Sequence, residues 1–339
     1  SASANAAVLA PAAFAVDLVS TNTPVAGENL TVTANVANTG DAEATQTITL
    51  DLGALGTDST SVTLGGGNAT ERTLSVSTGA GDAGAYTATV SSEDDSASAN
   101  VTVLAPAAFT VDIVSTGQPV EGENLTVTAS IENTGDLEAT QTITLDVGAL
   151  GSDSTAVTLG GGSSTNVSLA VGTSAGDAGE YTATVSSADD AASANATVLA
   201  PALFGVNITA VDGSVCEGET VTVSYEVANT GDVAATQNIT FAVEGSVEAT
   251  EQGVTLGGGE TFAGQFSYDT ATGDVPGVEV SVASGDDAAT ASATVDEPAF
   301  FAVEITDIDA EVAAGTEVTV EYAVENTGDV EDTQNITFA

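Results

Sequence analysis

The sequence Asn38-Thr39-Gly40-Asp41 decides the fold of this chain, because it occurs four times at nearly equal spacing. The further copies stand at residues 133–136, 229–232 and 326–329, so the intervals are 95, 96 and 97 residues. A period of that length corresponds to one domain of ordinary size and is too long for a solenoid unit. The chain is therefore expected to be a tandem array of one domain.

Each copy of the motif stands between two stretches in which apolar and polar residues alternate, such as residues 30–36 and 48–52 around the first copy. Asn, Gly and Asp tolerate positive φ or hydrogen-bond their own backbone, so between two such stretches they predict a turn. We expect the Asn and Gly of every copy to be structural. These residues are Asn38, Gly40, Asn133, Gly135, Asn229, Gly231, Asn326 and Gly328.

The same alternation predicts seven strands in the first full repeat, at residues 14–19, 30–36, 45–52, 59–64, 70–76, 86–91 and 98–104. Such strands place one face in a core and the other in water. The glycines at 65–67 are expected to form a hairpin turn, and the acids at 93–95 another. No stretch carries a capped apolar period of 3.6 residues, so essentially no helix is expected.

The repeats divide the chain into five parts. Residues 1–11 correspond to the last strand of a preceding repeat, and residues 12–106, 107–201 and 202–298 are three full repeats. Residues 299–339 form the first half of a further repeat. Half a sandwich leaves its core face open to water, so we expect a segment of a longer array. Ala-Pro at the joints restricts the backbone and predicts short, stiff linkers.

The composition is extremely acidic, with 49 acids among 339 residues, Arg72 as the sole basic residue and a net charge of −48. Such charge with few aromatic residues is typical of disorder, but 42% apolar residues in strict alternation argue against it. At molar salt the screening length is about 3 Å, so the composition indicates adaptation to high salt. Without cations to neutralise phosphate, nucleic acid and an anionic membrane surface are not expected partners. No run approaches the roughly 18 apolar residues of a membrane-spanning helix.

The residue types leave little room for catalysis. Ser is plentiful, but no His or Lys is present to act as its base. Paired carboxylates of the glycosidase kind are available by type, yet acids recur at matching places in every repeat, where a catalytic site would be unique. The G-x-G-x-x-G match at residues 79–84 is followed by a predicted strand instead of the helix of a dinucleotide site. We therefore expect neither an enzyme nor an organic cofactor.

Three kinds of candidate site remain. Acidic turns near the end of each repeat offer oxygen ligands for Ca²⁺, the alternative being solvated turns; their residues are Asp94, Asp95, Asp189, Asp190, Asp286 and Asp287. Nine N-x-[ST] sequons are candidate N-glycosylation sites in a secreted protein, at Asn29, Asn68, Asn100, Asn124, Asn166, Asn195, Asn207, Asn238 and Asn335. The lone Cys216 either bridges two copies or stays an inert thiol.

Residues 82–88 resemble the tyrosine corner of immunoglobulin-like (Ig-like) domains, in which a Tyr at the start of the sixth strand bonds to upstream backbone. We expect Tyr86 and its counterpart Tyr181 to be buried. The third repeat has Val278 there, so its corner must be held otherwise. The wider pattern of Phe-x-Val-x-Ile, Gly-Glu-x-x-x-Val, Asn-Thr-Gly-Asp and Thr-Gln-x-Ile-Thr is similar to CARDB-type and related Ig-like repeats of haloarchaeal surface proteins.

The resemblance implies seven-stranded Ig-like β-sandwiches joined end to end, located outside the cell at its surface. Together with the composition it predicts a structural protein, a segment of a filament, fibre or stalk that associates with copies of itself. Two alternatives stay open. One is an adhesin that binds sugars or another cell surface, against which 4% aromatic residues and no Trp count. The other is a spacer array of a secreted enzyme whose catalytic domain lies outside this segment.

Overall fold

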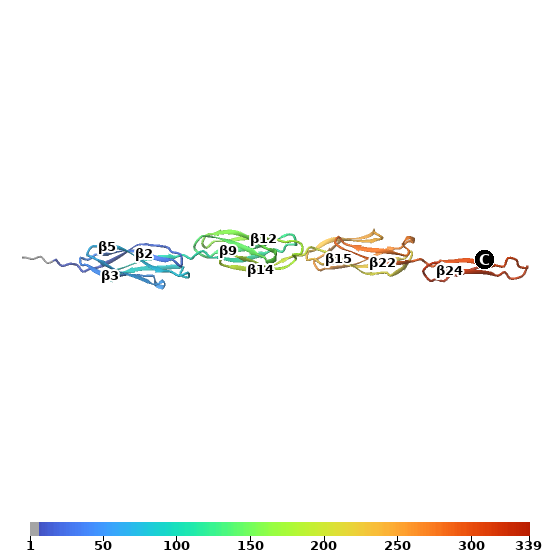
Figure 1. Cartoon of the computed structure of the whole chain (residues 1–339), viewed down its shortest axis with the longest axis horizontal. Coiled ribbons are helices and arrows are strands. Elements are labelled where there is room, and N and C mark those ends of the chain that lie inside the picture. Colours follow the sequence, from blue (N-terminus) through green and yellow to red (C-terminus); the bar gives the residue numbers. More distant parts are fainter. Residues whose placement is uncertain (1–6) are drawn as a thin grey trace, which may run out of the picture. The chain divides into compact units, whose positions relative to one another are not determined.

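The computed structural model describes residues 7–339, which are all-β and form tandem Ig-like β-sandwiches (Figure 1). Helix is confined, in the described part of the chain, to three single 3₁₀ turns: η1 (Gly53–Leu55), η2 (Gly148–Leu150) and η3 (Thr272–Asp274). The chain divides into two compact units. One contains the first repeat and most strands of the second, and the other contains the third repeat, the partial repeat and two loops of the second repeat, residues 118–123 and 173–179.

In the first repeat, seven strands form two antiparallel sheets. The strands are β1 (Phe14–Thr21), β2 (Asn29–Asn38), β3 (Ala44–Asp51), β4 (Thr57–Leu64), β5 (Ala69–Ser77), β6 (Gly84–Ser91) and β7 (Ser96–Val103). One sheet has the order β1-β2-β5 and the other β4-β3-β6-β7. A constant-type immunoglobulin domain places its fourth strand beside the fifth, whereas here β4 pairs with β3.

The pairing of β4 corrects one expectation. Because β4 and β5 belong to different sheets, the glycines at residues 65–67 form a connection between sheets and no hairpin. The Gly67 N–H donates to the Asn38 carbonyl, at 2.9 Å, so this connection packs on the Asn-Thr-Gly-Asp turn. The alternation of residues identified both strands correctly, but it does not say which strands pair. The acidic turn at 93–95 does join paired strands, β6 and β7.

The second and third repeats follow the same plan. The second contains β8 (Phe109–Thr116), β9 (Asn124–Asn133), β10 (Ala139–Asp146), β11 (Ser152–Leu159), β12 (Ser164–Gly172), β13 (Gly179–Ser186) and β14 (Ala191–Val198), in sheets β12-β9-β8 and β11-β10-β13-β14. The third contains β15 (Phe204–Val211), β17 (Thr220–Asn229), β18 (Ala235–Val243), β19 (Ser246–Leu256), β20 (Thr261–Asp269), β21 (Gly277–Ala283) and β22 (Ala288–Asp296). Its additional short strand β16 (Ser214–Cys216) pairs parallel with β22.

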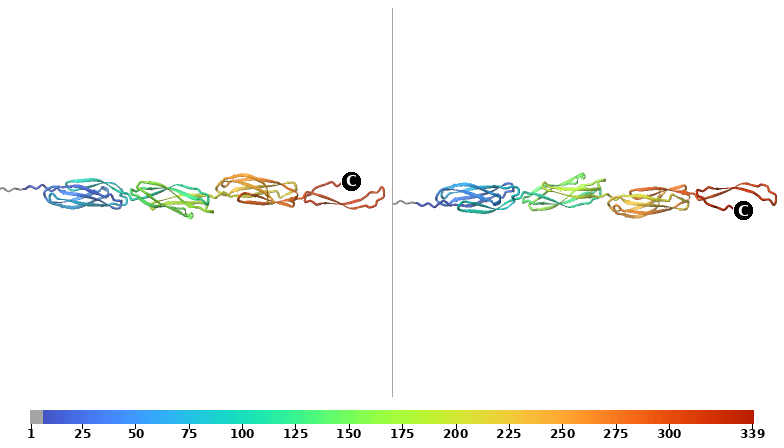
Figure 2. Two further views of the ribbon diagram at one scale, coloured as in Figure 1. Left: turned by 90° about the horizontal axis from the view of Figure 1, so that it is seen from above. Right: turned by 90° about the horizontal axis from the view of Figure 1, so that it is seen from below.

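Each complete repeat encloses a separate core built from alternate residues of both sheets. Figure 2 shows the strands of each complete repeat gathered into a body of their own. Phe14 and Leu30 are fully buried in the first repeat. The third core adds an aromatic stack, in which the Phe266 ring centroid lies 4.9 Å from that of Tyr225 and 5.2 Å from that of Phe241. Every full repeat therefore carries the apolar burial that a sandwich requires.

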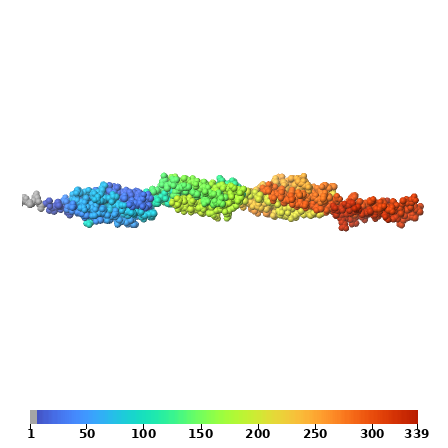
Figure 3. Space-filling view, in the orientation of Figure 1, coloured from blue at the N-terminus to red at the C-terminus, as the bar shows by residue number. Residues whose placement is uncertain are grey.

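The two ends of the chain look different from the full repeats. In the partial repeat only β23 (Phe301–Ile308) and β24 (Val320–Asn326) pair, and Figure 3 shows residues 299–339 as slimmer than the repeats before them. A strand was expected at residues 1–11. Residues 1–6 lie outside the described residues, and residues 7–11 form no strand, since Ala10 bonds instead to the turn at Asp41.

Candidate functional site at the joints between repeats

The side chain of Asn38 fixes the Asn-Thr-Gly-Asp turn from within. It is 1% exposed, and its amide uses all of its hydrogen-bonding capacity. Oδ1 accepts from Gly40 N at 3.1 Å and from Ala13 N at 3.3 Å, while Nδ2 donates to the carbonyls of Ala42, at 2.8 Å, and Leu64, at 3.0 Å. The corresponding Asn133 and Asn229 are equally buried. The buried amide therefore holds both sides of the turn in one conformation.

Gly40 is required because the backbone of the preceding linker lies against it. A Cβ at this position would collide with the carbonyl oxygen of Pro11. The same collision, with the Pro of the linker before each repeat, would occur at Gly135, Gly231 and Gly328. We expected glycine here for its tolerance of positive φ, and that reason is wrong, because the glycine of the motif has an ordinary φ in every copy. Glycine is needed instead because the linker and the turn approach each other too closely for a side chain.

Asp41 binds the linker directly. Its Oδ2 accepts from the backbone N–H of Ala10 at 2.9 Å, and its own N–H donates to the Ala10 carbonyl at 3.1 Å. This two-bond clasp occurs in all four motif copies, and its other three members are Asp136 with Ala105, Asp232 with Ala200 and Asp329 with Glu297. Sequence reasoning missed this role, since the motif alone does not show what its Asp faces.

The residue immediately before the clasp is fixed to the preceding repeat. Leu104 donates its N–H to the Pro24 carbonyl at 2.8 Å and accepts from Ala26 N at 2.9 Å. The next residue, Ala105, belongs to the clasp of the following repeat. Leu199 and Ala200 repeat this arrangement. Of two consecutive residues, the first is thus bound to one repeat and the second to the next, so no unbound residue separates the two repeats.

The acidic turns proposed for Ca²⁺ hold the two sheets of each sandwich together. Asp94 Oδ2 accepts from Phe14 N at 2.8 Å and Gln46 Nε2 at 2.6 Å, and Asp95 Oδ2 accepts from Val16 N at 3.0 Å. Asp189 with Asp190 and Asp286 with Asp287 make the same contacts. Over residues 7–339 no group of three or more His, Cys, Asp or Glu is placed to hold a metal ion, and Ca²⁺ binding stays a prediction.

These hydrogen bonds also shift the acidity of three of the aspartates. The Phe14 N–H, followed by the Gln46 amide, holds the pKa of Asp94 below its usual value. For Asp189 the Gln141 amide is the larger cause of the lowered pKa, and the Phe109 N–H comes second. Each of these bonds stabilises the charged carboxylate. The turns are therefore built around ionised Asp.

The tyrosine-corner residues are half-buried and not buried as expected. Tyr86 donates its hydroxyl to the Asp82 carbonyl at 2.8 Å, and because Asp82 lies in a surface turn, the ring stays at the margin of the core. Tyr181 is half-buried as well. In the third repeat Val278 is buried, and Tyr268 of β20 approaches this corner instead, with its hydroxyl 3.1 Å from Asp274 Oδ2.

All nine sequon asparagines are exposed. Most lie in strands, with the following residue turned inward, as Val101 after Asn100. The Asn and the Ser or Thr two positions later therefore project from the same outer face. Cys216 is a half-buried free thiol, and burial together with the carboxylates of Glu219 and Asp296 raises its pKa. This shift disfavours the reactive thiolate.

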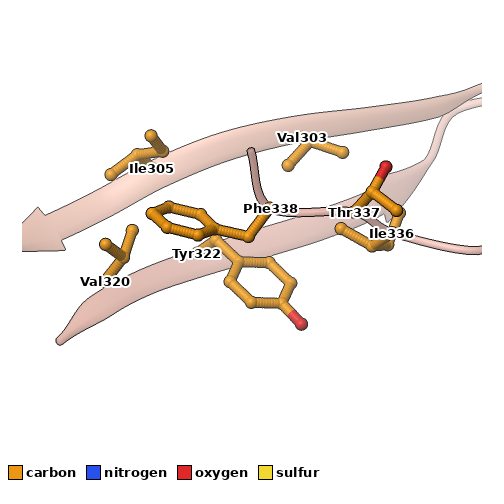
Figure 4. A pocket seen from close by; sticks show the side chains of 7 residues that line it. All are labelled: Val303, Ile305, Val320, Tyr322, Ile336, Thr337 and Phe338. Atoms are coloured by element: carbon orange, nitrogen blue, oxygen red, sulfur yellow. The ribbon is translucent and has the colours of Figure 1, made fainter. Parts of the chain in front are cut away.

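A cavity on the partial repeat is lined by apolar residues (Figure 4). The Phe338 ring lies over Tyr322, beside Ile305 and Val320. Phe338 corresponds in the third repeat to Phe241, which is fully buried, so this cavity is an uncovered sandwich core. No titratable acid or base that could serve catalysis near pH 7 lines it. No helix among residues 7–339 is long and apolar enough to cross a membrane.

Residues 21–101 match the model of a family described as a domain of unknown function, DUF7407. No curated protein matches the chain. Among solved structures the chain is similar to a three-Ig fragment of titin, with 16% identity and a TM-score of 0.28 over 84% of this chain and 98% of that one. It is also similar to Sidekick-1 immunoglobulin domains 1–5, with 17% identity and a TM-score of 0.27 over 85% of this chain and 59% of that one.

A third similar structure is Escherichia coli alpha-2-macroglobulin, with 13% identity and a TM-score of 0.24 over 84% of this chain. The chain spans 33% of that much longer protein. Similarities at these identities and TM-scores carry no argument, and the strand order of each repeat establishes the sandwich by itself. The family match covers one repeat, so the resemblance to CARDB-type repeats stays a prediction.

Proposed function

We propose that this chain is a structural protein of the cell surface, a segment of an extracellular filament, fibre or stalk in an organism that lives at high salt. Tandem sandwiches with separate cores and a charge of −48 support this proposal. The observation that carries it is the joint, in which Leu104 and Ala105 are bound to successive repeats without a free residue between them.

Such a joint resists bending because a change of angle must break backbone hydrogen bonds. Four bonds hold Leu104 and Ala105, and each contributes roughly 0.5–1.5 kcal/mol. Pro106 follows directly and fixes its own φ, which removes a further rotation. A stiff joint suits a protein that spans a distance or bears tension, whereas a flexible tether would leave the linker residues unbound.

The two alternatives differ in what the array carries. An adhesin commonly binds through exposed aromatic side chains, and the large apolar side chains exposed on the described full repeats are Val19, Val114, Leu203 and Val247, with no aromatic ring among them. A spacer of a secreted enzyme would share the architecture of a fibre and would end in a catalytic domain.

Electron microscopy of the native cell surface, with antibodies against the repeats, tests the proposal. We expect label along continuous filaments or fibres. Isolated thin stalks that end in globular heads would favour the enzyme spacer, and label confined to the cell interior would contradict a surface role altogether.

N-glycosylation forms part of the same proposal, supported by the nine exposed sequons. The unmodified segment has a mass of 32.9 kDa. Mass spectrometry of the native protein is expected to find glycan on at least some sequon peptides, and unmodified peptides at all nine positions would contradict it. We infer that copies of the chain also associate with one another.

A further inference from the structure

The outer face of the four-stranded sheet carries hydroxyl side chains almost throughout. We use the name hydroxyl face for the outward residues of β3, β4, β6 and β7 and their counterparts in the second repeat. The register places Thr45 opposite Thr63 and Thr47 opposite Ser61, and Ser and Thr fill 13 of the 16 outward positions of the first repeat. The remaining three are Asp51, Ala85 and Asn100. The result is a surface of short side chains on which Asp51 is the single charged residue.

This face stands out because of its lack of charge. Residues 12–106 contain 11 acids, and only Asp51 lies on the hydroxyl face, at the end of β3. The other acids lie in turns, point inward or project from the three-stranded sheet. The second repeat has two acids on this face, Asp146 and Glu180. In a chain with a net charge of −48, this is where another copy can approach with little repulsion.

The hydroxyls of this face are also ordered. Thr45 Oγ1 lies 2.7 Å from Thr63 Oγ1, and Thr89 Oγ1 lies 2.9 Å from Ser98 Oγ. The second repeat has the same pairs, with Thr140 Oγ1 2.7 Å from Thr158 Oγ1. Hydroxyls that are already paired keep a hydrogen bond when water leaves the face, and the Thr methyl groups add apolar area. Both effects lower the cost of contact with a matching surface.

Aspartates at both edges of the three-stranded sheet hinder edge-to-edge association. Asp94 and Asp95 occupy the N–H groups of Phe14 and Val16 on β1. On the other side Asp58 of β4 accepts from Ser75 N of β5 at 2.9 Å. Inward-pointing charge on an edge strand such as β4 is a known barrier to strand addition. These carboxylates therefore disfavour strand addition at β1, β5 and β4.

We propose that the hydroxyl face of one chain packs against the hydroxyl face of a second copy, an inference that rests on the proposed fibre function. Four strands about 4.8 Å apart and seven residues of about 3.3 Å give a face of roughly 440 Å². One pair of repeats then buries about 900 Å² in total, below the roughly 1,600 Å² of a standard interface. Association is therefore weak for one repeat and strengthens when several repeats engage.

Sedimentation velocity of the whole chain in molar salt tests this. The face variant is Thr45→Asp with Thr140→Asp, and the control is Thr73→Asp with Ser168→Asp on the outer face of the three-stranded sheets. All four positions are exposed, and each substitution adds one charge and removes one hydroxyl pair. We expect the parent and control to form dimers or larger species with increasing concentration, and the face variant to stay monomeric up to at least tenfold higher concentration.

A second face variant, Thr47→Asp with Thr142→Asp, shows whether any loss of association is specific to one position. Circular dichroism confirms that every variant is folded. Association of both folded face variants like the parent would overturn the proposal. A parent that stays monomeric would also overturn it, but would leave the stiff-joint account untouched. The sequons Asn100 and Asn195 lie on this face, so glycan on both in assembled native protein would equally contradict face-to-face packing.

Discussion

Asp136 holds Ala105 by two hydrogen bonds, one from the Ala105 N–H to its carboxylate at 2.7 Å and one from its own N–H to the Ala105 carbonyl at 3.1 Å. These residues stand 31 positions apart, on either side of the first two strands of the second repeat, β8 and β9. The motif that recurs in every repeat is therefore the binding site for the linker that precedes that repeat. Its Asn shapes the turn, its Gly admits the linker and its Asp binds it.

Replacing the motif glycine should damage the joint. In Gly135→Ala the new methyl group collides with the Pro106 carbonyl, so linker or turn must move. We expect a loss of about 1–3 kcal/mol, which lowers the melting temperature of the second repeat by at least about 4 °C. The measurement is thermal unfolding in molar salt. Gly81→Ala is the control, since a Cβ there meets open space, and equal melting curves for the two variants would contradict the clasp.

Loss of the Tyr86 hydroxyl should weaken the first repeat modestly. Tyr86→Phe removes the bond to the Asp82 carbonyl, which contributes about 0.5–1.5 kcal/mol, and the lower end is expected because Tyr86 is half-buried. Denaturant melts measure the difference. Tyr322→Phe, at a 56% exposed position of the partial repeat, should leave them unchanged. Parent-like stability of Tyr86→Phe would refute the tyrosine corner.

Strand positions could be predicted from the sequence because alternation reports directly which side chains meet the core. Strand partners could not, as the glycines at 65–67 show, since a connection between sheets and a hairpin share the same residue types. The roles of Gly40 and Asp41 could not be predicted from the sequence for a related reason. Both depend on the linker backbone, whose position follows from the fold and not from a motif.

The acidic turns illustrate a second limit. Asp94 and Asp95 carry the residue types of a Ca²⁺ site, of a solvated turn and of a clasp between sheets alike. Only the position of β1, 80 residues earlier in the chain, shows that their carboxylates meet backbone N–H groups. In the third repeat, Tyr268 could not be identified as the residue at the corner, because it comes from a different strand than Tyr86.

The same carboxylates predict a dependence of stability on pH. The folded pKa of Asp94 lies below the value near 3.9 expected in the unfolded chain. Its contribution is therefore complete above that value and is lost as pH falls through the folded pKa. Molar salt screens the repulsion between the other acids, so the experiment is done there. The Asp94→Asn variant should be less stable to unfolding than the parent at pH 7, and this difference in stability should shrink on acidification. A difference that stays constant from pH 7 to below the folded pKa would contradict it.

Folding should require salt. Dilution from molar salt to about 0.1 M lengthens the screening distance from roughly 3 Å to 10 Å and exposes the charges of a −48 chain to one another. We expect the β-sheet signal in circular dichroism to decline on dilution and to return when salt is restored. An unchanged spectrum and melting temperature at low salt would rule out this account of the composition.

Small-angle X-ray scattering in molar salt, extrapolated to infinite dilution so that single chains are seen, tests the stiff joint most directly. Strands of about eight residues give a repeat of nearly 40 Å with its loops, so three and a half stiffly joined repeats extend about 130 Å. The predicted radius of gyration is near 37 Å, and insertion of Gly-Ser-Gly-Ser between Leu104 and Ala105 should lower it. A value near the 20 Å of a compact globule, or one that the insertion leaves unchanged, would contradict the central claim.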